Sequence, residues 1–149
     1  MVILRHYAKP RINRNKEEVE TLIYHVLKYP QVKNRYVRGL LSELIWKLSE
    51  CPEGKYSTRL VSKEVSISLH KGIEVQHEHI VPKKFIIDEL VKNKNNNSKL
   101  KEILDSVEGC IVTVNEHKRL KDKYGYDWKK RYKDAHISVI DRKTRKKEV

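Results

Sequence analysis

Residues 76–84 read Gln-His-Glu-His-Ile-Val-Pro-Lys-Lys, and this stretch decides how the rest of the chain is interpreted. It closes an alternating run, residues 73–77, that predicts a short β-strand. Imidazole and carboxylate side chains bind divalent metals, and a neutral imidazole accepts a proton near pH 7. Pro82 breaks the chain after the strand. We therefore expect Glu78 and His79 at a strand end, one aimed at a metal and the other at a nucleophilic water.

A second stretch, residues 110–120, reads Cys-Ile-Val-Thr-Val-Asn-Glu-His-Lys-Arg-Leu. Its β-branched run over 110–114 predicts a strand. Asn115 is a suitable N-cap for the helix that follows, which places His117 in the first turn. If the two strands pair as a hairpin, His117 meets the segment that carries Glu78 and His79.

Together the two stretches resemble the HNH, or ββα-metal, endonuclease family. The segment Glu78-His79-Ile80-Val81-Pro82 is similar to that family's Asp-His-Ile-x-Pro motif, and the segment from Val112 to Lys118 is similar to its strand-to-helix exit. The resemblance covers residues 77–120 closely and residues 60–140 loosely. The N-terminal helices described below lie outside it.

The resemblance implies a metal-dependent endonuclease that hydrolyses phosphodiester bonds in DNA. His79 would be the general base, while Glu78 and His117 would hold one divalent ion at the scissile phosphate and leaving 3′ oxygen. Mg²⁺ or Mn²⁺ is the expected ion, with Zn²⁺ and Ni²⁺ as alternatives. Four basic residues would flank the bound DNA phosphate: Lys83, Lys84, Lys118 and Arg119. The resemblance also suggests a phage, mobile-element or defence setting.

The sequence departs from the family in three places. Thr113 and Glu116 stand where many members carry a second Cys-x-x-Cys clamp, so we expect no structural zinc. The slot of the middle Asn falls at Glu108 or Gly109, which leaves the orientation of His79 to a backbone carbonyl or another side chain, or indicates a degenerate site. The two histidines are also 117 − 79 = 38 positions apart. This separation exceeds that of a plain ββα hairpin, and we assign the extra residues to inserted helices at 83–92 and 98–107.

The N-terminal part predicts an antiparallel helix pair over 15–50. Asn15 and Glu18 have the spacing of a capping box, and apolar residues then recur at helical spacing over 16–29 and again over 36–49. The second stripe is wide enough for either intramolecular packing or a dimer. Trp46 lies beside this stripe, and we interpret it as a packing residue.

The expected fold is α+β and mainly helical, with a small antiparallel β-hairpin and helix packed against the N-terminal pair. We predict a single domain over 1–149: a basic lead-in over 1–14, the helix pair over 15–50, an HNH-like core over 60–140, and a disordered basic tail over 141–149. Within the core, Ser62 caps a short helix and residues 135–140 form a strand. An aromatic cluster is expected to form a small core rather than to stack on bases: Tyr124, Tyr126, Trp128 and Tyr132.

Composition narrows the class of protein. Lys plus Arg is 33 and Asp plus Glu is 20, a net charge of +13, which attracts phosphate backbones. Apolar runs fall short of the roughly 18 residues of a membrane span, so we expect no membrane partner. Two cysteines, Cys51 and Cys110, indicate reduced thiols and a cytoplasmic protein. Five glycines and no glycine-rich phosphate loop argue against nucleotide hydrolysis.

Two other functions compete with the endonuclease. The missing middle Asn and the basic termini favour a non-catalytic nucleic-acid-binding module, either a degenerate HNH fold or a small basic regulator. The helix pair over 16–49 would instead suit a protein-interaction domain. His77 is an extra candidate that points the same way as His79, and we interpret it as a partly exposed strand residue without a role.

Overall fold

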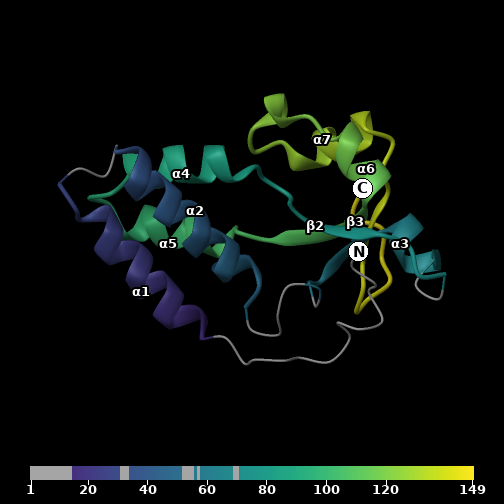
Figure 1. Ribbon diagram of the computed structural model, residues 1–149, viewed down its shortest axis with the longest axis horizontal. Helices are drawn as coiled ribbons and strands as arrows, with labels where there is room; N and C mark the ends of the chain where they lie inside the picture. The colour runs from purple at the N-terminus through teal and green to yellow at the C-terminus, as the bar shows by residue number, and fades with distance from the viewer. Residues whose placement is uncertain (1–14, 31–33, 52–55, 57, 69–70) are drawn as a thin grey trace.

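A computed structural model describes residues 15–30, 34–51, 56, 58–68 and 71–149 (Figure 1). The fold is α+β and about 54% helical, with one four-stranded mixed sheet. The predicted class is confirmed at this level. The basic lead-in expected over 1–14 lies outside the described residues.

The N-terminal helix pair consists of α1 (Lys16–Leu27) and α2 (Arg35–Ser49). Each begins at an Asn cap, because the Asn15 and Asn34 side chains accept hydrogen bonds from backbone N–H groups of their first turns. The inner positions of both apolar stripes are buried: Ile23, Leu27, Leu41, Ile45 and Leu48. The predicted helix pair is therefore confirmed, whereas Leu22 and Leu40 at the stripe edges are half exposed.

The sheet has the strand order β2-β3-β1-β4. Its strands are β1 (Leu60–Ser62), β2 (Val75–His79), β3 (Gly109–Thr113) and β4 (Val139–Asp141). β2 pairs antiparallel with β3, and β3 runs parallel to β1. The three-residue β1 was not predicted, because so short a run carries no periodic signal. β2 occupies an edge of the sheet, which leaves one of its sides open.

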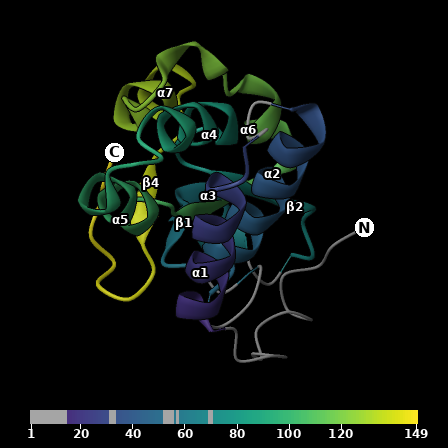
Figure 2. The same ribbon diagram turned by 90° about the vertical axis from the view of Figure 1, so that its left-hand side faces the viewer.

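Two helices separate β2 from β3 along the chain, as predicted. They are α4 (Lys83–Lys92) and α5 (Asn97–Asp105), and both pack on the N-terminal pair. Arg38 of α2 binds Asp88 of α4 at 2.5 Å, and Lys101 of α5 binds Glu20 of α1 at 3.1 Å. The views in Figures 1 and 2 show α1, α2, α4 and α5 gathered at one end of the molecule, with the sheet beyond them.

Shorter helices surround the sheet: α3 (Lys63–Ser68), α6 (Val114–Arg119) and α7 (Trp128–Asp134), with the 3-10 turn η2 (Asp122–Tyr124) before α7. The cap of α6 differs from the prediction. Thr113, not Asn115, caps it in a capping box with Glu116, because the strand delivers Thr113 in extended conformation directly before the first turn.

The aromatic cluster divides into two parts. Trp128 and Tyr132 of α7 pack edge-to-face at 5.9 Å within the core, as expected. Tyr126 is 43% exposed, and the Tyr124 hydroxyl donates a 2.7 Å hydrogen bond to Asp134 at the surface. Of the four aromatic residues, the α7 pair therefore packs inside, as part of the main hydrophobic core rather than of a separate small one.

The prediction of a disordered tail over 141–149 is wrong. Asp141 ends β4, and its carboxylate accepts hydrogen bonds from the N–H groups of Lys143 and Thr144. The resulting turn sends the chain back along β4, where Glu148 N–H donates to the Val139 carbonyl at 2.8 Å. The basic composition indicated solvated chain, but the turn at Asp141 and the backbone hydrogen bonds back to β4 order the segment.

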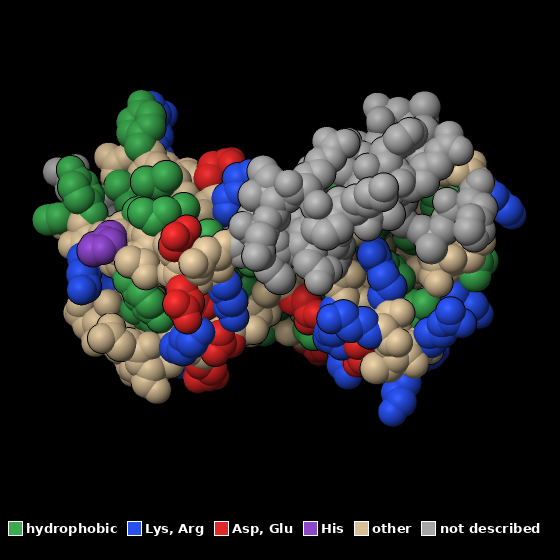
Figure 3. Space-filling model, turned by 90° about the horizontal axis from the view of Figure 1, so that it is seen from below, with side chains coloured by type: hydrophobic (Ala, Val, Ile, Leu, Met, Phe, Trp, Pro, Cys, Tyr) green, Lys and Arg blue, Asp and Glu red, His purple; other side chains and the backbone are tan. Residues whose placement is uncertain are grey.

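Charge and apolar side chains are unevenly distributed over the surface. On the face seen in Figure 3, and outside its grey region, apolar side chains gather over the helical end, whereas Lys and Arg predominate at the other end. In the described part of the chain, no helix combines the length and apolarity that crossing a membrane requires.

Gly109 of β3 provides a test of how the His77 ring of β2 packs against the neighbouring strand. A Cβ built at Gly109 would overlap the imidazole of His77, so Gly109→Ala should lower the free energy of unfolding by about 1–3 kcal/mol through overpacking. Gly39→Ala on α2 is the matched control, because a Cβ there meets no atom within 4 Å and should add about 0.5–1 kcal/mol. Urea denaturation measures both, and a Gly109→Ala protein as stable as wild type would contradict the packing.

Candidate functional site

The residues predicted from the 76–84 motif converge on a hollow of about 300 Å³ at the open edge of β2. Five of the seven predicted site residues line it: Glu78, His79, Lys83, Lys84 and His117. Trp46, Gln76, His77, Pro82 and Asp122 complete the lining. Lys118 and Arg119 are exposed at the end of α6 and are not part of the lining.

The register of β2 on β3 brings Glu78 to His117. Glu78 lies opposite Cys110, three residues before Thr113, where the chain enters α6. The first turns of α6 then carry His117 back, and its Nδ1 lies 2.6 Å from Glu78 Oε2. Gln76, on the same face of β2, has its Nε2 3.3 Å from the other ring nitrogen of His117. A carboxylate oxygen and an imidazole nitrogen are thereby joined across 39 positions of sequence.

His79 lies on the opposite face of β2 from Glu78. The sequence indicated a strand that ends in this pair with its two side chains aimed differently; β2 continues through His79, and neighbouring strand residues point to opposite faces. His79 is 3% exposed, and its ring centroid is 4.8 Å from that of Trp46. Glu78 and His79 therefore line the same hollow from opposite faces of the edge strand.

Burial lowers the pKa of His79 to about 3, with the nearby charges of His77 and Lys83 acting in the same direction. A hydrogen bond to the Ile45 backbone opposes this shift. The imidazole is thus neutral at pH 7, the form that can accept a proton. Its Nε2 is buried and has no hydrogen-bond partner among the described residues.

The two positions in the middle-Asn slot do not orient His79. Glu108 turns to the surface, where both its carboxylate oxygens bind Arg59 at 2.9 and 3.2 Å. Gly109 instead makes room for the His77 ring. The backbone of Ile45 in α2 forms a hydrogen bond with His79.

His77 has a packing role in the structure. It points the same way as His79, as predicted, but it is 1% exposed, so the expectation of partial exposure is wrong. Its Nε2 lies 3.2 Å from the Ser49 hydroxyl, and its ring centroid is 5.0 Å from that of Trp46. α2 covers this face of the strand, and the sequence did not indicate that contact.

Arg131 is the site residue that sequence reasoning missed. It is 2% exposed, lies on α7, and donates to Glu78 Oε1 at 3.1 Å and to the His79 carbonyl at 2.9 Å. In the sequence it is one cation among several in a basic stretch whose helix was itself not predicted. Its inward direction depends on packing, so the local sequence contains no signal that could have identified it.

The donor set is compatible with a single divalent ion of modest affinity. Among the described residues, no three His, Cys, Asp or Glu side chains are grouped to hold a metal. Glu78 and His117 provide two donors, and Mg²⁺ commonly takes one or two protein carboxylates and fills its other positions with water and phosphate oxygens. Glu78 Oε2 and His117 could serve as its two protein donors once the 2.6 Å contact between them opens, since Oε1 is held by Arg131.

Lys83 connects the hollow to α2. Its ammonium lies 5.0 Å from the centroid of the Trp46 ring, a cation–π contact on the side of the indole that faces the hollow's rim. Lys84 follows it on the lining. These two cations give this part of the hollow an attraction for anions.

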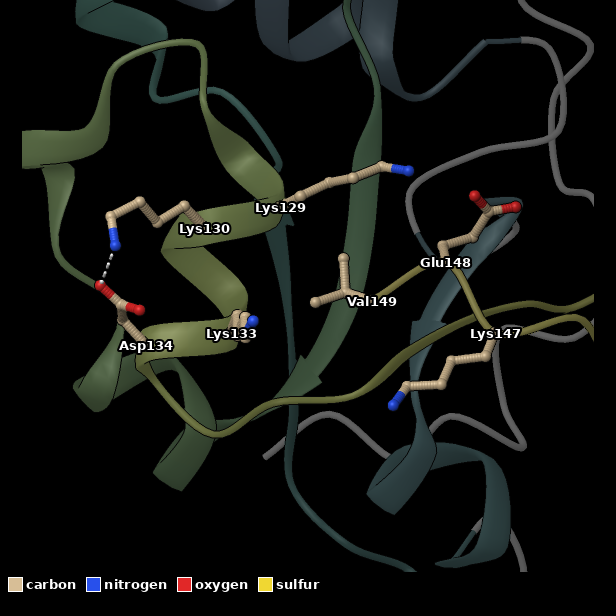
Figure 4. A pocket seen from close by; sticks show the side chains of 7 residues that line it. All are labelled: Lys129, Lys130, Lys133, Asp134, Lys147, Glu148 and Val149. Atoms are coloured by element: carbon tan, nitrogen blue, oxygen red, sulfur yellow. Dashed lines mark ion pairs between the residues drawn. The ribbon is translucent and has the colours of Figure 1, made fainter.

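A different hollow, of about 580 Å³, lies between α7 and the C-terminal segment (Figure 4). Four lysines line it together with Asp134 and Glu148. Lys130 is paired with Asp134 at 3.2 Å. None of the seven site residues predicted from the sequence lines this second hollow, so the candidate site is the hollow at the edge of β2.

No protein-family model, curated protein or solved structure matches this chain. The case for function therefore depends on the geometry of the hollow and on the resemblance of its motif.

The lowered pKa of His79 predicts an acid-sensitive fold. Unfolded His79 takes up a proton below about pH 6.5, whereas the folded residue does so only near pH 3, so its contribution is complete above pH 6.5 and is lost as the pH falls. Lowering the pH from 7 to 5 should therefore reduce the free energy of unfolding by about 2 kcal/mol through His79. Urea denaturation in EDTA measures it.

His79→Phe keeps an aromatic ring but does not titrate, so it should remove most of that difference, while exposed His25→Ala should retain it. An identical pH dependence in His79→Phe and wild type would contradict the burial of His79.

Proposed function

We propose that this protein is a metal-dependent endonuclease of the HNH type that hydrolyses phosphodiester bonds in DNA. One observation carries the proposal: Glu78 and His117, the two metal ligands implied by the motif, lie 2.6 Å apart. The contact is formed by an antiparallel strand pair followed at once by a helix. That is the order of elements expected of a ββα-metal site.

Glu78 Oε2 and His117 would hold the divalent ion. When bound, such an ion supplies Lewis-acid stabilisation of the charge that develops on the phosphate and the leaving oxygen. His79 removes a proton from the attacking water at Nε2, for which its neutral state is required. His79 Nε2 is buried and the Trp46 ring packs against this imidazole, so the step requires that water gain access to Nε2.

Basic side chains support DNA as the substrate. Lys83 and Lys84 line the hollow, Lys118 and Arg119 extend from the end of α6, and the chain carries a net charge of +13. Phosphate contacts of this kind give affinity without sequence preference and weaken with salt. A cytoplasmic location and a phage or mobile-element setting remain predictions from the sequence.

A non-catalytic nucleic-acid-binding module is the second candidate. The burial of His79 and the bond between Arg131 and Glu78 favour it, because His79 is closed off from solvent and Glu78 is already paired. This alternative predicts DNA binding that does not depend on His79, on Glu78 or on a divalent ion.

Nicking of a supercoiled plasmid distinguishes the two functions. Wild type should nick with Mg²⁺ or Mn²⁺ and stop in EDTA. His79→Ala should bind DNA normally in an EDTA gel shift yet cut at least about a hundred-fold more slowly, since a general base contributes about 10²- to 10⁴-fold. Glu78→Gln should also bind DNA and fail to cut.

His25→Ala is the matched control, because His25 is exposed on α1 and lines no part of the hollow. It should cut at the wild-type rate. Equal DNA binding by all four proteins with no cleavage by any of them would reject the endonuclease and leave the binding module.

A further inference from the structure

We infer that Arg131 is a positioning residue of this site, and that it acts through the shape of its guanidinium rather than through its charge. The inference rests on the proposed function. Arg131 lies on α7, outside the motif segments, and donates to Glu78 and to the backbone of His79. One side chain thereby fixes the position of the proposed metal ligand and of the strand end that carries the proposed base.

Every N–H group of Arg131 has an acceptor. Nη1 donates to the carbonyls of His79 and Ile80, at 2.9 and 3.3 Å. Nη2 donates to Glu78 Oε1 at 3.1 Å and to Asp122 Oδ1 at 3.0 Å, and Nε donates to the Lys121 carbonyl at 3.0 Å. A guanidinium has five such donors in a rigid fork, so the arrangement uses all of them.

These five acceptors belong to the two parts of the site. Glu78 and His79 end β2 and Ile80 follows directly, while Lys121 and Asp122 follow α6, the helix that carries His117. Arg131 thus fixes the distance between the strand end and the segment after the helix. It also occupies Oε1 of Glu78 and leaves Oε2 toward His117 Nδ1, which selects the oxygen available to a metal.

Charge alone does not explain this arrangement. A buried cation is costly unless it is paired, and Arg131 is paired with the carboxylates of Glu78 and Asp122. A positive charge beside a metal ligand also opposes binding of a divalent cation. What Arg131 contributes to the site is therefore the geometry of its hydrogen bonds.

Arg131→Lys separates geometry from charge, because lysine keeps the charge but has three donors on one nitrogen. We expect it to cut plasmid at least about ten-fold more slowly in single turnover, since displacements near 1 Å cost up to about a hundred-fold. We also expect Mn²⁺ titrated into the metal-free protein to bind at least about five-fold more weakly, because the substitution would displace its proposed ligand Glu78 in the same way. DNA affinity in EDTA should stay within about two-fold, because the phosphate contacts are retained.

Arg59→Lys is the matched control. Arg59 also binds several carboxylates, at Glu108, Asp141 and Glu148, but lies outside the hollow. Cleavage and Mn²⁺ binding in this variant should stay within about two-fold of wild type, because it disturbs a comparable ion-pair network away from the chemistry.

Asp122→Asn keeps the inference testable if Arg131→Lys does not fold. The Asp122 side chain is 73% exposed, so the variant should fold, and it weakens one of the five bonds that orient Arg131. A loss of about two- to ten-fold in both cleavage rate and Mn²⁺ affinity is expected, smaller than that of Arg131→Lys.

The outcomes separate this inference from the function on which it rests. If wild type neither binds Mn²⁺ nor cuts DNA, the proposed function fails and the inference fails with it. If wild type does both and folded Arg131→Lys matches it, or Asp122→Asn matches it where Arg131→Lys is unfolded, the inference alone is overturned. Equal losses in Arg59→Lys and Arg131→Lys would also overturn it, since they would indicate a general effect on stability.

Discussion

Glu78 lies opposite Cys110 in the antiparallel pairing of β2 with β3, and this register determines which side chains meet at the site. A slip of one residue would turn Glu78 toward α2 and His79 toward α6, because strand side chains alternate. Packing on both faces opposes such a slip. His77 fits only against a glycine at position 109, and the fork of Arg131 fits only the carbonyls at the end of β2.

The N-terminal helices, which lie outside the resemblance, contribute directly to the hollow. α2 provides Trp46 against the His79 ring and the Ile45 backbone as its hydrogen-bond partner. The helices α4 and α5 pack on this pair, and ion pairs such as Arg38 with Asp88 cross the contact. Surface ion pairs add little stability each, so the buried apolar faces of the four helices supply most of the attachment. Packing of α4 and α5 on α2 therefore stabilises the cover over His79.

Periodic patterns made most of the fold predictable. The apolar stripes of α1 and α2 and the β-branched run of β3 gave these elements their correct type, because each is long enough for its period to be counted. β1, with three residues, and α7, whose stretch is rich in lysine, were missed. The C-terminal turn was missed for a related reason, since its order depends on the Asp141 turn and on backbone pairing with β4, which leave no periodic pattern.

The site was predictable only in part, and the reason is geometric. Chain order indicated that Glu78 and His117 would meet, and the structure brings them into contact. It could not indicate that α2 covers the face of β2 to which His79 points. Arg131 comes from a helix whose inward face is fixed by tertiary packing, and no local pattern marks it. Trp46 lies beside a predicted apolar stripe, but its contact with His79 depends on how α2 packs against β2.

The central claim is that Glu78 and His117 together bind a divalent ion, and a crystal soaked in Mn²⁺ tests it most directly. The account predicts one anomalous peak about 2.0–2.3 Å from both Glu78 Oε2 and a His117 ring nitrogen, the usual range for oxygen and nitrogen ligands of divalent ions. A peak bound by other residues, or no peak while Glu78 stays bonded to Arg131 and His117, would contradict it.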